Sequence, residues 1–172
     1  MRRLARESDL DTVYAIHMDE AVIPFLGIEP LALEEFRPVY AGLLAIGSFY
    51  VLEEQGKIAG FYKVTRFEGR ARHVAQLGTL AVAPRFQGSG IGRRMVADAI
   101  ARLSAAGVRR IELIVESDNP RGVAFYQRMG FQIEGRLRMF YKRAHQDHYV
   151  DDFMMALLVP SGPSEERIAA DS

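Results

Sequence analysis

Cysteine is absent from this chain of 172 residues. Its absence excludes a disulfide framework, a thiolate metal site and a cysteine nucleophile, although it does not fix the compartment. An excess of charge of either sign is also missing, because Lys and Arg balance Asp and Glu at 22 each. The chain as a whole therefore creates no field that would attract nucleic acid or an anionic membrane surface.

Long apolar runs are missing as well, since no segment approaches the roughly 18 uninterrupted apolar residues of a membrane span. In the opening stretch MRRLARESDLD the arginines are followed by acids instead of an apolar run, which argues against a secretory signal. We therefore expect a soluble cytoplasmic protein that has no membrane partner, no nucleic-acid partner and no bound metal.

The chain does contain enough apolar material for one packed domain, because hydrophobic residues make up 49% of it. We find no internal repeat and no linker, so we expect a single domain over residues 1–159. Residues 160–172, PSGPSEERIAADS, have the small, polar and proline-containing composition of a disordered C-terminal tail.

Hydrophobic periodicity and turn residues predict the order of helices and strands. The predicted helices are residues 8–20, 30–47, 90–106 and 119–130, and the predicted strands are residues 1–6, 48–55, 57–69, 72–82, 108–117, 131–143 and 148–159. Ser8 is the expected N-cap of the first helix, and Pro38 is expected to kink or divide the second. This order predicts an α/β or α+β fold in which helices cover the faces of one sheet.

The stretch VAPRFQGSGIGRRMVADAI, residues 82–100, places glycines at positions 88, 90 and 92 between a strand and a helix. Such a turn leaves main-chain N–H groups uncovered at the positive end of the helix dipole, where phosphate oxygens bind. Arg85, Arg93 and Arg94 add positive charge, which favours a polyanionic ligand. The dinucleotide fingerprint and the Walker loop both fail on spacing. The simpler alternative is that the glycines only allow a tight turn.

The same turn fits the pattern Q-x-x-G-x-G with Gln87, Gly90 and Gly92. LGTLAVAP lies upstream of it, and NPRGVAFYQRMGF lies downstream. Together these stretches resemble the GNAT superfamily of acetyl-CoA-dependent N-acetyltransferases, in which the glycine pattern binds pyrophosphate. The resemblance extends over residues 3–158. It implies a GNAT-like, mixed and mostly antiparallel central sheet of about seven strands, flanked by about four helices.

The resemblance implies direct transfer of an acetyl group from acetyl-CoA to a primary amine in a ternary complex. The main chain near residues 80–82 would then polarise the thioester carbonyl, and Tyr126 would act as the general acid. The alternatives are that Tyr126 only packs and that Asn119 is only an N-cap. The implied cofactor-binding residues are Leu80, Ala81, Val82, Gln87, Gly88, Ser89, Gly90, Ile91, Gly92, Arg93, Asn119 and Tyr126.

No general base can be assigned from the sequence. Many relatives place a glutamate on the fourth strand, where this chain has Gln76, and glutamine cannot take a proton. The open candidates are His73, Asp151, Asp152, His148, Tyr149 and a water chain to bulk solvent.

The acceptor pocket implied by the resemblance lies between the first two helices and the closing strands. Its predicted substrate-binding residues are Phe25, Leu26, Gln76 and Asp151, and acids near the cleft would attract an ammonium group. A small amine or an amino acid is the first expectation. The alternatives are a protein N-terminus, as in acetyltransferases of the ribosomal-protein type, and a non-catalytic acyl-CoA-binding module on the same fold. Closing strands of this fold often pair across a dimer, so a homodimer is a further expectation.

Overall fold

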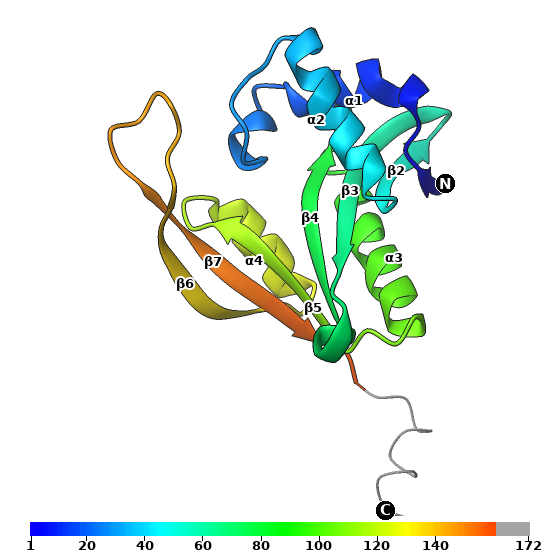
Figure 1. The fold of residues 1–172 in the computed structure, drawn as a ribbon, viewed down its shortest axis with the longest axis vertical. Helices are drawn as coiled ribbons and strands as arrows, with labels where there is room; N and C mark the ends of the chain where they lie inside the picture. Colours follow the sequence, from blue (N-terminus) through cyan, green and yellow to red (C-terminus); the bar gives the residue numbers. More distant parts are fainter. Residues whose placement is uncertain (161–172) are drawn as a thin grey trace, which may run out of the picture.

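The computed structural model describes residues 1–160, and all of its strands belong to one seven-stranded sheet. The strands are β1 (Arg2–Leu4), β2 (Phe49–Glu54), β3 (Lys57–Arg66), β4 (Val74–Val82), β5 (Arg110–Glu116), β6 (Gln132–Tyr141) and β7 (Val150–Leu158). Their order across the sheet is β1-β2-β3-β4-β5-β7-β6, and β4 with β5 is the parallel pair among them (Figure 1). The predicted mixed, mostly antiparallel sheet is confirmed. The predicted tail lies, beyond Pro160, outside the described residues.

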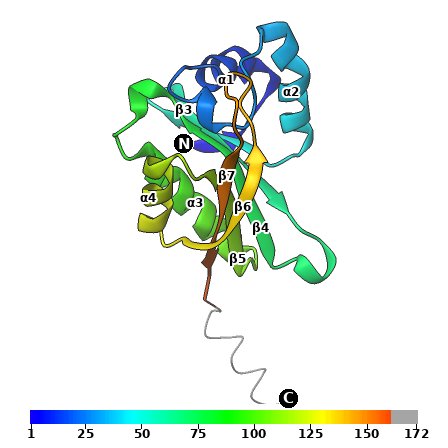
Figure 2. The same cartoon turned by 90° about the vertical axis from the view of Figure 1, so that its left-hand side faces the viewer.

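The described residues form four α-helices, which cover the two faces of the sheet (Figures 1 and 2). They are α1 (Leu10–His17), α2 (Leu33–Ala45), α3 (Ile91–Ala105) and α4 (Pro120–Arg128). Helices α1 and α2 pack on β2 and β3 through Val13, Phe36 and Tyr40. Helix α3 buries Met95 and Ala99 on the other face, where α4 also packs. Full burial of a methionine side chain such as that of Met95 stabilises a fold by about 1.5–3 kcal/mol. Within residues 1–160 no helix has the length and apolar character needed to cross a bilayer.

The start of α1 differs from the prediction, because Ser8 is not its N-cap. A 3₁₀ turn, Glu7–Asp9, precedes the helix, and the Asp9 carboxylate accepts a hydrogen bond from the Arg6 N–H at 2.8 Å. The same carboxylate accepts two hydrogen bonds from the Arg3 guanidinium, at 2.6 and 2.9 Å. A serine hydroxyl cannot form this ion pair. The Asp9 carboxylate therefore fixes the 3₁₀ turn before α1, although it makes no cap hydrogen bond to α1 itself.

Helix α2 is one continuous helix with Pro38 inside it, so the prediction that Pro38 divides the helix is wrong. Proline removes one N–H donor and crowds the carbonyl of Glu34, four residues earlier. Phe36, Tyr40 and Leu43 are buried from the same helix, so tertiary packing offsets this local cost.

The parallel strands β4 and β5 pair over only three residues of each, 74–76 with 110–112, and then separate (Figure 1). On its other edge β4 carries a bulge, because Gly78 pairs with Lys63 and Ala81 already pairs with Phe61. Thr79, inside the bulge, has a φ of 47°, in keeping with the local distortion that a bulge introduces. The carboxyl half of β4 therefore keeps an edge toward β5 that no strand within residues 1–160 covers.

One ionisable side chain, His17, lies inside the core between α1, α2 and the sheet, with 2% of its surface exposed. Its ring stacks on Phe61 with the centroids 5.5 Å apart and lies 5.0 Å from the Phe36 ring. Neither ring nitrogen has a hydrogen-bond partner among residues 1–160. Burial lowers the pKa of His17 to about 4, because the charged imidazolium loses its hydration there.

We predict that His17 makes the fold sensitive to acid. Between about pH 6.5 and about pH 4 the unfolded chain binds a proton that the folded chain does not, so the free energy of unfolding falls as the pH falls. At about 1.4 kcal/mol per pKa unit, the loss is on the order of 3 kcal/mol. Urea unfolding across this window should give a flatter pH profile for His17→Leu than for the wild type. Equal slopes for the two proteins would contradict the prediction.

Candidate active site

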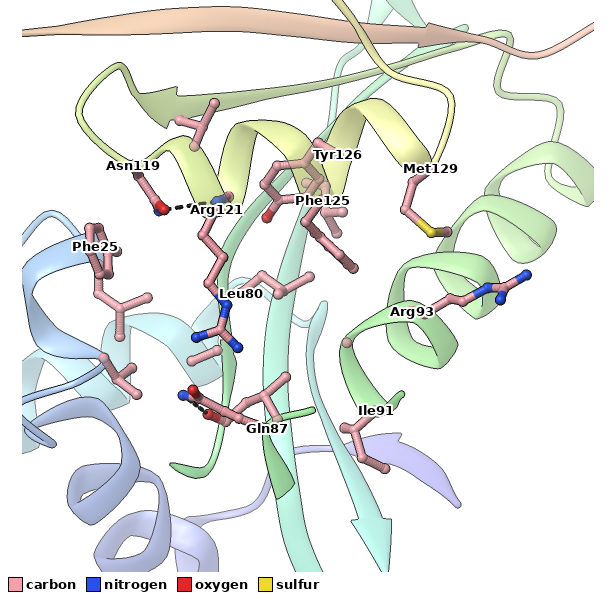
Figure 3. Close-up of a pocket in the computed structure, with 18 of the residues that line it drawn as sticks. Phe25, Leu80, Gln87, Ile91, Arg93, Asn119, Arg121, Phe125, Tyr126 and Met129 are labelled. Carbon is pink, nitrogen blue, oxygen red and sulfur yellow. Dashed lines mark hydrogen bonds between the residues drawn. The ribbon is translucent and has the colours of Figure 1, made fainter. Parts of the chain in front are cut away.

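A cavity of about 770 Å³ opens where β4 and β5 separate. Its walls are residues 77–82 of β4, residues 114–116 of β5, the glycine turn with the start of α3, and one side of α4. Phe25 in the α1–α2 connection also lines it. In Figure 3, Arg121 and Tyr126 project from α4 on the side that faces Leu80 and Gln87. The separation of two strands thus makes the sheet itself one wall of the site.

The glycine turn presents bare main chain to this cavity. Gly88 and Gly90 have φ values of 77° and 84°, which glycine tolerates best, and a Cβ at either would meet no atom within 4 Å. Gly90 is the N-cap of α3. Among residues 1–160, no acceptor bonds the main-chain N–H groups of residues 88 and 90–93. Free donors that face open space at a helix N-terminus are suited to phosphate oxygens.

The positive charge near the turn comes partly from arginines other than the predicted ones. Arg94 is engaged elsewhere, because it pairs with Glu54 at 2.9 Å. Arg93, Arg121 and Arg128 line the cavity, and none of them has an ion-pair partner within the described part of the chain. These three guanidinium groups are therefore available to a polyanionic ligand.

Helix α4 begins at Pro120, and the Asn119 side chain caps it by accepting a hydrogen bond from the Gly122 N–H at 2.8 Å. The structural role predicted for Asn119 is confirmed, and the same residue also lines the cavity. A Cβ at Gly122 would lie 2.6 Å from Asn119 Nδ2, so the cap leaves no room for a larger residue. The cap fixes where α4 starts and hence where its side chains meet the cavity.

Tyr126 lies on the cavity side of α4 and packs edge-on against Phe125 and Phe131, with ring centroids 5.1 and 5.8 Å apart. Burial raises the pKa of the Tyr126 hydroxyl above its ordinary range, and the negative charge of Glu116 raises it further. The hydroxyl is therefore protonated at neutral pH, which is the state a general acid requires. Packing and proton donation are compatible roles here.

The cavity brings together most of the residues predicted for the site. Those that line it are Phe25, Leu26, Leu80, Ala81, Val82, Gln87, Gly88, Gly90, Ile91, Gly92, Arg93, Asn119 and Tyr126. Ser89, Gln76 and Asp151 lie outside its lining. The Ser89 hydroxyl donates to the Phe86 carbonyl, Gln76 lies in the paired part of β4, and Asp151 pairs with Arg136 at 2.6 Å.

The suggested bases lie in different places. His73 precedes β4 at the far end of the strand, where its carbonyl accepts hydrogen bonds from two main-chain N–H groups. His148 is exposed beside Asp147, and Tyr149 is 53% exposed. Asp152 is buried on β7 directly opposite a residue that lines the cavity. Asp152 is thus the candidate best placed to influence the site.

That opposite residue is Glu116, which the sequence analysis missed. Glu116 ends β5, is buried, and lines the cavity. Burial raises the pKa of Glu116 to about 7, and the charge of Asp152 adds to the rise. The available signal was its position, three residues before Asn119 at the carboxyl end of a strand parallel to β4. No cluster of three or more potential metal-ligating side chains occurs within residues 1–160.

Comparison of the sequence with known proteins points to one family. The profile of the acetyltransferase (GNAT) family matches residues 10–131. A mycothiol acetyltransferase of Propionibacterium freudenreichii is 36% identical over 105 residues, which cover 60% of this chain and 31% of that protein. The N-alpha-acetyltransferase RimI of Mycobacterium tuberculosis is 31% identical over 94 residues, covering 55% of this chain and 58% of that protein. The chain therefore spans less than a third of that mycothiol acetyltransferase.

Solved structures have the same fold. The ribosomal-protein-alanine N-acetyltransferase of Brucella melitensis superposes with a TM-score of 0.74 at 24% identity, over 92% of this chain and 99% of that one. A phosphinothricin acetyltransferase of the GNAT superfamily from Sinorhizobium meliloti, solved in complex with AcCoA, has a TM-score of 0.73 at 20% identity, over 95% of this chain and 90% of that one. At these identities the likeness concerns the fold.

We predict that the buried Glu116 carboxyl lowers the free energy of unfolding as the pH rises. Its folded-state pKa is raised, so between about pH 4.5 and about pH 7 the folded chain holds a proton that the unfolded chain has lost. The free energy of unfolding therefore falls as the pH rises through this window.

At about pH 8, Glu116→Gln should be more stable than the wild type by on the order of 3 kcal/mol, and the gain should shrink toward about pH 5. Urea unfolding at the two pH values measures it. Glu112→Gln is the matched control on the same strand, where the carboxylate pairs with Arg110 at 3.0 Å, and it should bring no gain. A Glu116→Gln protein no more stable than the wild type at the higher pH would refute the prediction.

Proposed function

We propose, starting from the fact that this chain belongs to the acetyltransferase (GNAT) family, that it transfers an acetyl group from acetyl-CoA to a primary amine in a ternary complex. One observation carries the proposal. Residues 88 and 90–93 line the cavity between β4 and β5, and their main-chain N–H groups have no acceptor among residues 1–160.

The residues present fit acetyl-CoA. The diphosphate would bind the N–H groups of the glycine turn, and Arg93, Arg121 and Arg128 would add positive charge. The uncovered edge of β4 offers main-chain hydrogen bonds to an extended ligand arm, in the manner of an added strand. When bound, acetyl-CoA supplies the activated acyl group as a thioester.

The chain's own residues would perform three tasks. The main chain at residues 80–82 would polarise the thioester carbonyl, since negative charge develops on that oxygen during the transfer. Tyr126 would donate a proton to the departing sulfur, because its hydroxyl is protonated and lines the cavity. The walls of the cavity would hold the amine and the thioester together, which replaces a collision in solution by a positioned encounter.

A small amine or an amino acid is the first candidate for the acceptor. Phe25 and Leu26 of the α1–α2 connection line the cavity and would contact it. A protein N-terminus is the second candidate, because one relative is named N-alpha-acetyltransferase RimI and another ribosomal-protein-alanine N-acetyltransferase. Both acceptors present the same reacting group, a primary amine.

We predict that Gly90→Glu weakens acetyl-CoA binding by about a hundredfold or more, which is roughly 2.7 kcal/mol. The new carboxylate would repel the diphosphate, and its side chain would fill the space in front of the free N–H groups. Isothermal titration of the folded protein with acetyl-CoA measures the effect.

Gly69→Glu is the matched control for this experiment. Gly69 also has a positive φ, 61°, with open space around a Cβ, but it lies in the β3–β4 connection outside the cavity lining. The Gly69→Glu protein should carry a backbone strain similar to that of Gly90→Glu and should bind acetyl-CoA with the wild-type affinity. Absence of acetyl-CoA binding in the folded wild type, or equal binding by Gly90→Glu, would reject the proposed function.

We predict that Tyr126→Phe lowers kcat by about a hundredfold and leaves the acetyl-CoA dissociation constant within about twofold, because it removes a proton donor and keeps the ring. Steady-state thiol release and calorimetry measure the two quantities. Tyr50→Phe, a ring-preserving change on β2 outside the cavity lining, should leave both unchanged. Full activity in Tyr126→Phe would show that this tyrosine only packs.

A further inference from the structure

At its carboxyl end β5 places Glu116 directly opposite Asp152 of β7. Side chains that oppose each other in an antiparallel pair lie on the same face of the sheet, close enough to interact. Both residues are buried, with 9% of Glu116 and 5% of Asp152 exposed. Two carboxyl groups thus lie close together in a low-dielectric environment. Ionising both at once costs a large free energy.

Polar atoms around this pair lack partners. Asp152 Oδ1 and the Tyr141 hydroxyl are buried and have no hydrogen-bond partner among residues 1–160. Tyr141 pairs with Val150, two residues before Asp152 on β7, and therefore lies on the same face. An unsatisfied buried acceptor costs about 1–3 kcal/mol. A ligand that brings N–H donors would recover this cost.

The nearby cation, Arg143, is engaged through its terminal nitrogens, while its Nε is buried without a hydrogen-bond partner among residues 1–160. Arg143 forms a two-pronged ion pair with Asp118, at 2.7 and 3.3 Å, and also donates to the Pro24 carbonyl at 3.3 Å. It shares its charge with Asp118, so it offsets the negative charge of the Glu116–Asp152 pair only in part. The pair is left with excess negative charge.

The Glu116–Asp152 pair lies on the side of the cavity where the amine acceptor is expected, next to the α1–α2 connection and the closing strands. Val115 packs into the core under α3 and α4, and neighbouring residues on a strand face opposite sides of the sheet. Glu116 therefore faces the side of the α1–α2 connection, which carries Phe25. The β6–β7 hairpin contacts that connection, because the Ala144 N–H donates to Glu29 at 2.7 Å.

We infer that the Glu116–Asp152 pair binds the ammonium group of the acceptor and takes its proton, and that the acceptor carries no carboxylate beside this amine. The inference rests on the proposed acetyl transfer and narrows its acceptor. Glu116 lines the cavity and is the catalytic residue in this scheme. Asp152 acts through Glu116 and is a positioning residue. An amino acid with a free carboxylate is disfavoured, because its anion would meet the pair's excess negative charge.

The charged surroundings agree with this role. Burial is the larger cause that raises the pKa of Glu116 to about 7 and that of Asp152 to about 6. Asp118 raises both values further and Arg143 lowers both. The charge of Glu116 also raises the pKa of the Tyr126 hydroxyl on α4 and of the Tyr141 hydroxyl on β6. With a pKa of about 7, the Glu116 carboxyl is partly ionised near neutral pH, and its ionised form can accept a proton from the ammonium group.

The protons of the reaction balance with this pair in place. The ammonium nitrogen loses one proton to the pair, which passes it to solvent, and the free amine then forms the C–N bond. The C–S bond breaks with its electron pair on sulfur, which takes the Tyr126 proton. The second proton lost by the nitrogen returns to Tyr126. One ammonium and one thioester thus give one amide, one thiol and one released proton.

The first experiment measures kcat/KM against pH for Glu116→Gln, Asp152→Asn and the control Glu112→Gln in the full chain. Glu116→Gln should lose about 10²–10⁴-fold at neutral pH and regain activity toward the pKa of the amine itself. Asp152→Asn should move the acidic limb of the profile to lower pH, because a like charge has been removed. The control should match the wild type. A wild-type profile for Glu116→Gln would overturn the inference.

The second experiment tests the acceptor chemistry with matched amines. Alaninamide and alanine differ in the carboxylate, and kcat/KM should be at least about tenfold higher for alaninamide. Glu116→Gln should reduce this preference. Butylamine and a tripeptide that begins with alanine then distinguish a small amine from a chain terminus. Equal use of alanine and alaninamide would overturn the inference.

Two measurements without turnover separate this inference from the proposed function. Calorimetry should give the same acetyl-CoA dissociation constant for Glu116→Gln and the wild type. Carboxyl ¹³C signals should show Glu116 titrating near neutral pH, at lower pH in Asp152→Asn, and at lower pH when butylammonium is added. A Glu116 signal that titrates as in a free peptide overturns the inference even in an active enzyme. Loss of acetyl-CoA binding in the wild type refutes the proposed function, whatever the carboxyls do.

Discussion

The parallel pairing of β4 with β5 stops at Gln76 and Glu112, and the site depends on this interruption. Had the ladder continued, β5 would cover the edge of β4 and fill the space that is now a cavity. The separation leaves main-chain groups of β4 uncovered and brings the end of β5 into contact with the cavity. The two hydrophobic clusters, one on each face of the sheet, hold the separated strands in place. A gap in regular secondary structure is thus stabilised by packing elsewhere.

Local sequence predicts much of the part of the site that would hold the acetyl donor. Glycine is the residue that best tolerates the backbone angles at positions 88 and 90, so the turn and its bare N–H groups could be predicted. Asn119 followed by proline predicts a helix start, and the cap is present as expected. These features depend on residues within a few positions of one another. The N-cap at Ser8 failed because Asp9 also pairs with Arg3, a contact that a local pattern does not contain.

The acceptor side could not be predicted in the same way, because it depends on strand register. Glu116 and Asp152 are 36 positions apart in the sequence, and only the pairing of β5 with β7 places them together. The commitment of Arg143 to Asp118 is likewise a contact between distant segments. The sequence predicts acids near a cleft, with Asp151 in the substrate site and both Asp151 and Asp152 open as bases. Alternation along β7 decides between the two, since Asp152 is buried while Asp151 pairs with Arg136.

The rim of the acceptor side is assembled from two loops, the α1–α2 connection and the β6–β7 hairpin, which meet through bonds from Arg143 and Ala144. Neither loop contributes to the glycine turn. Insertions or replacements in them would therefore leave the carrier-binding half of the protein intact, since loops tolerate change better than the elements they join. Evolution, or an engineer, can exchange the amine while retaining the acyl donor.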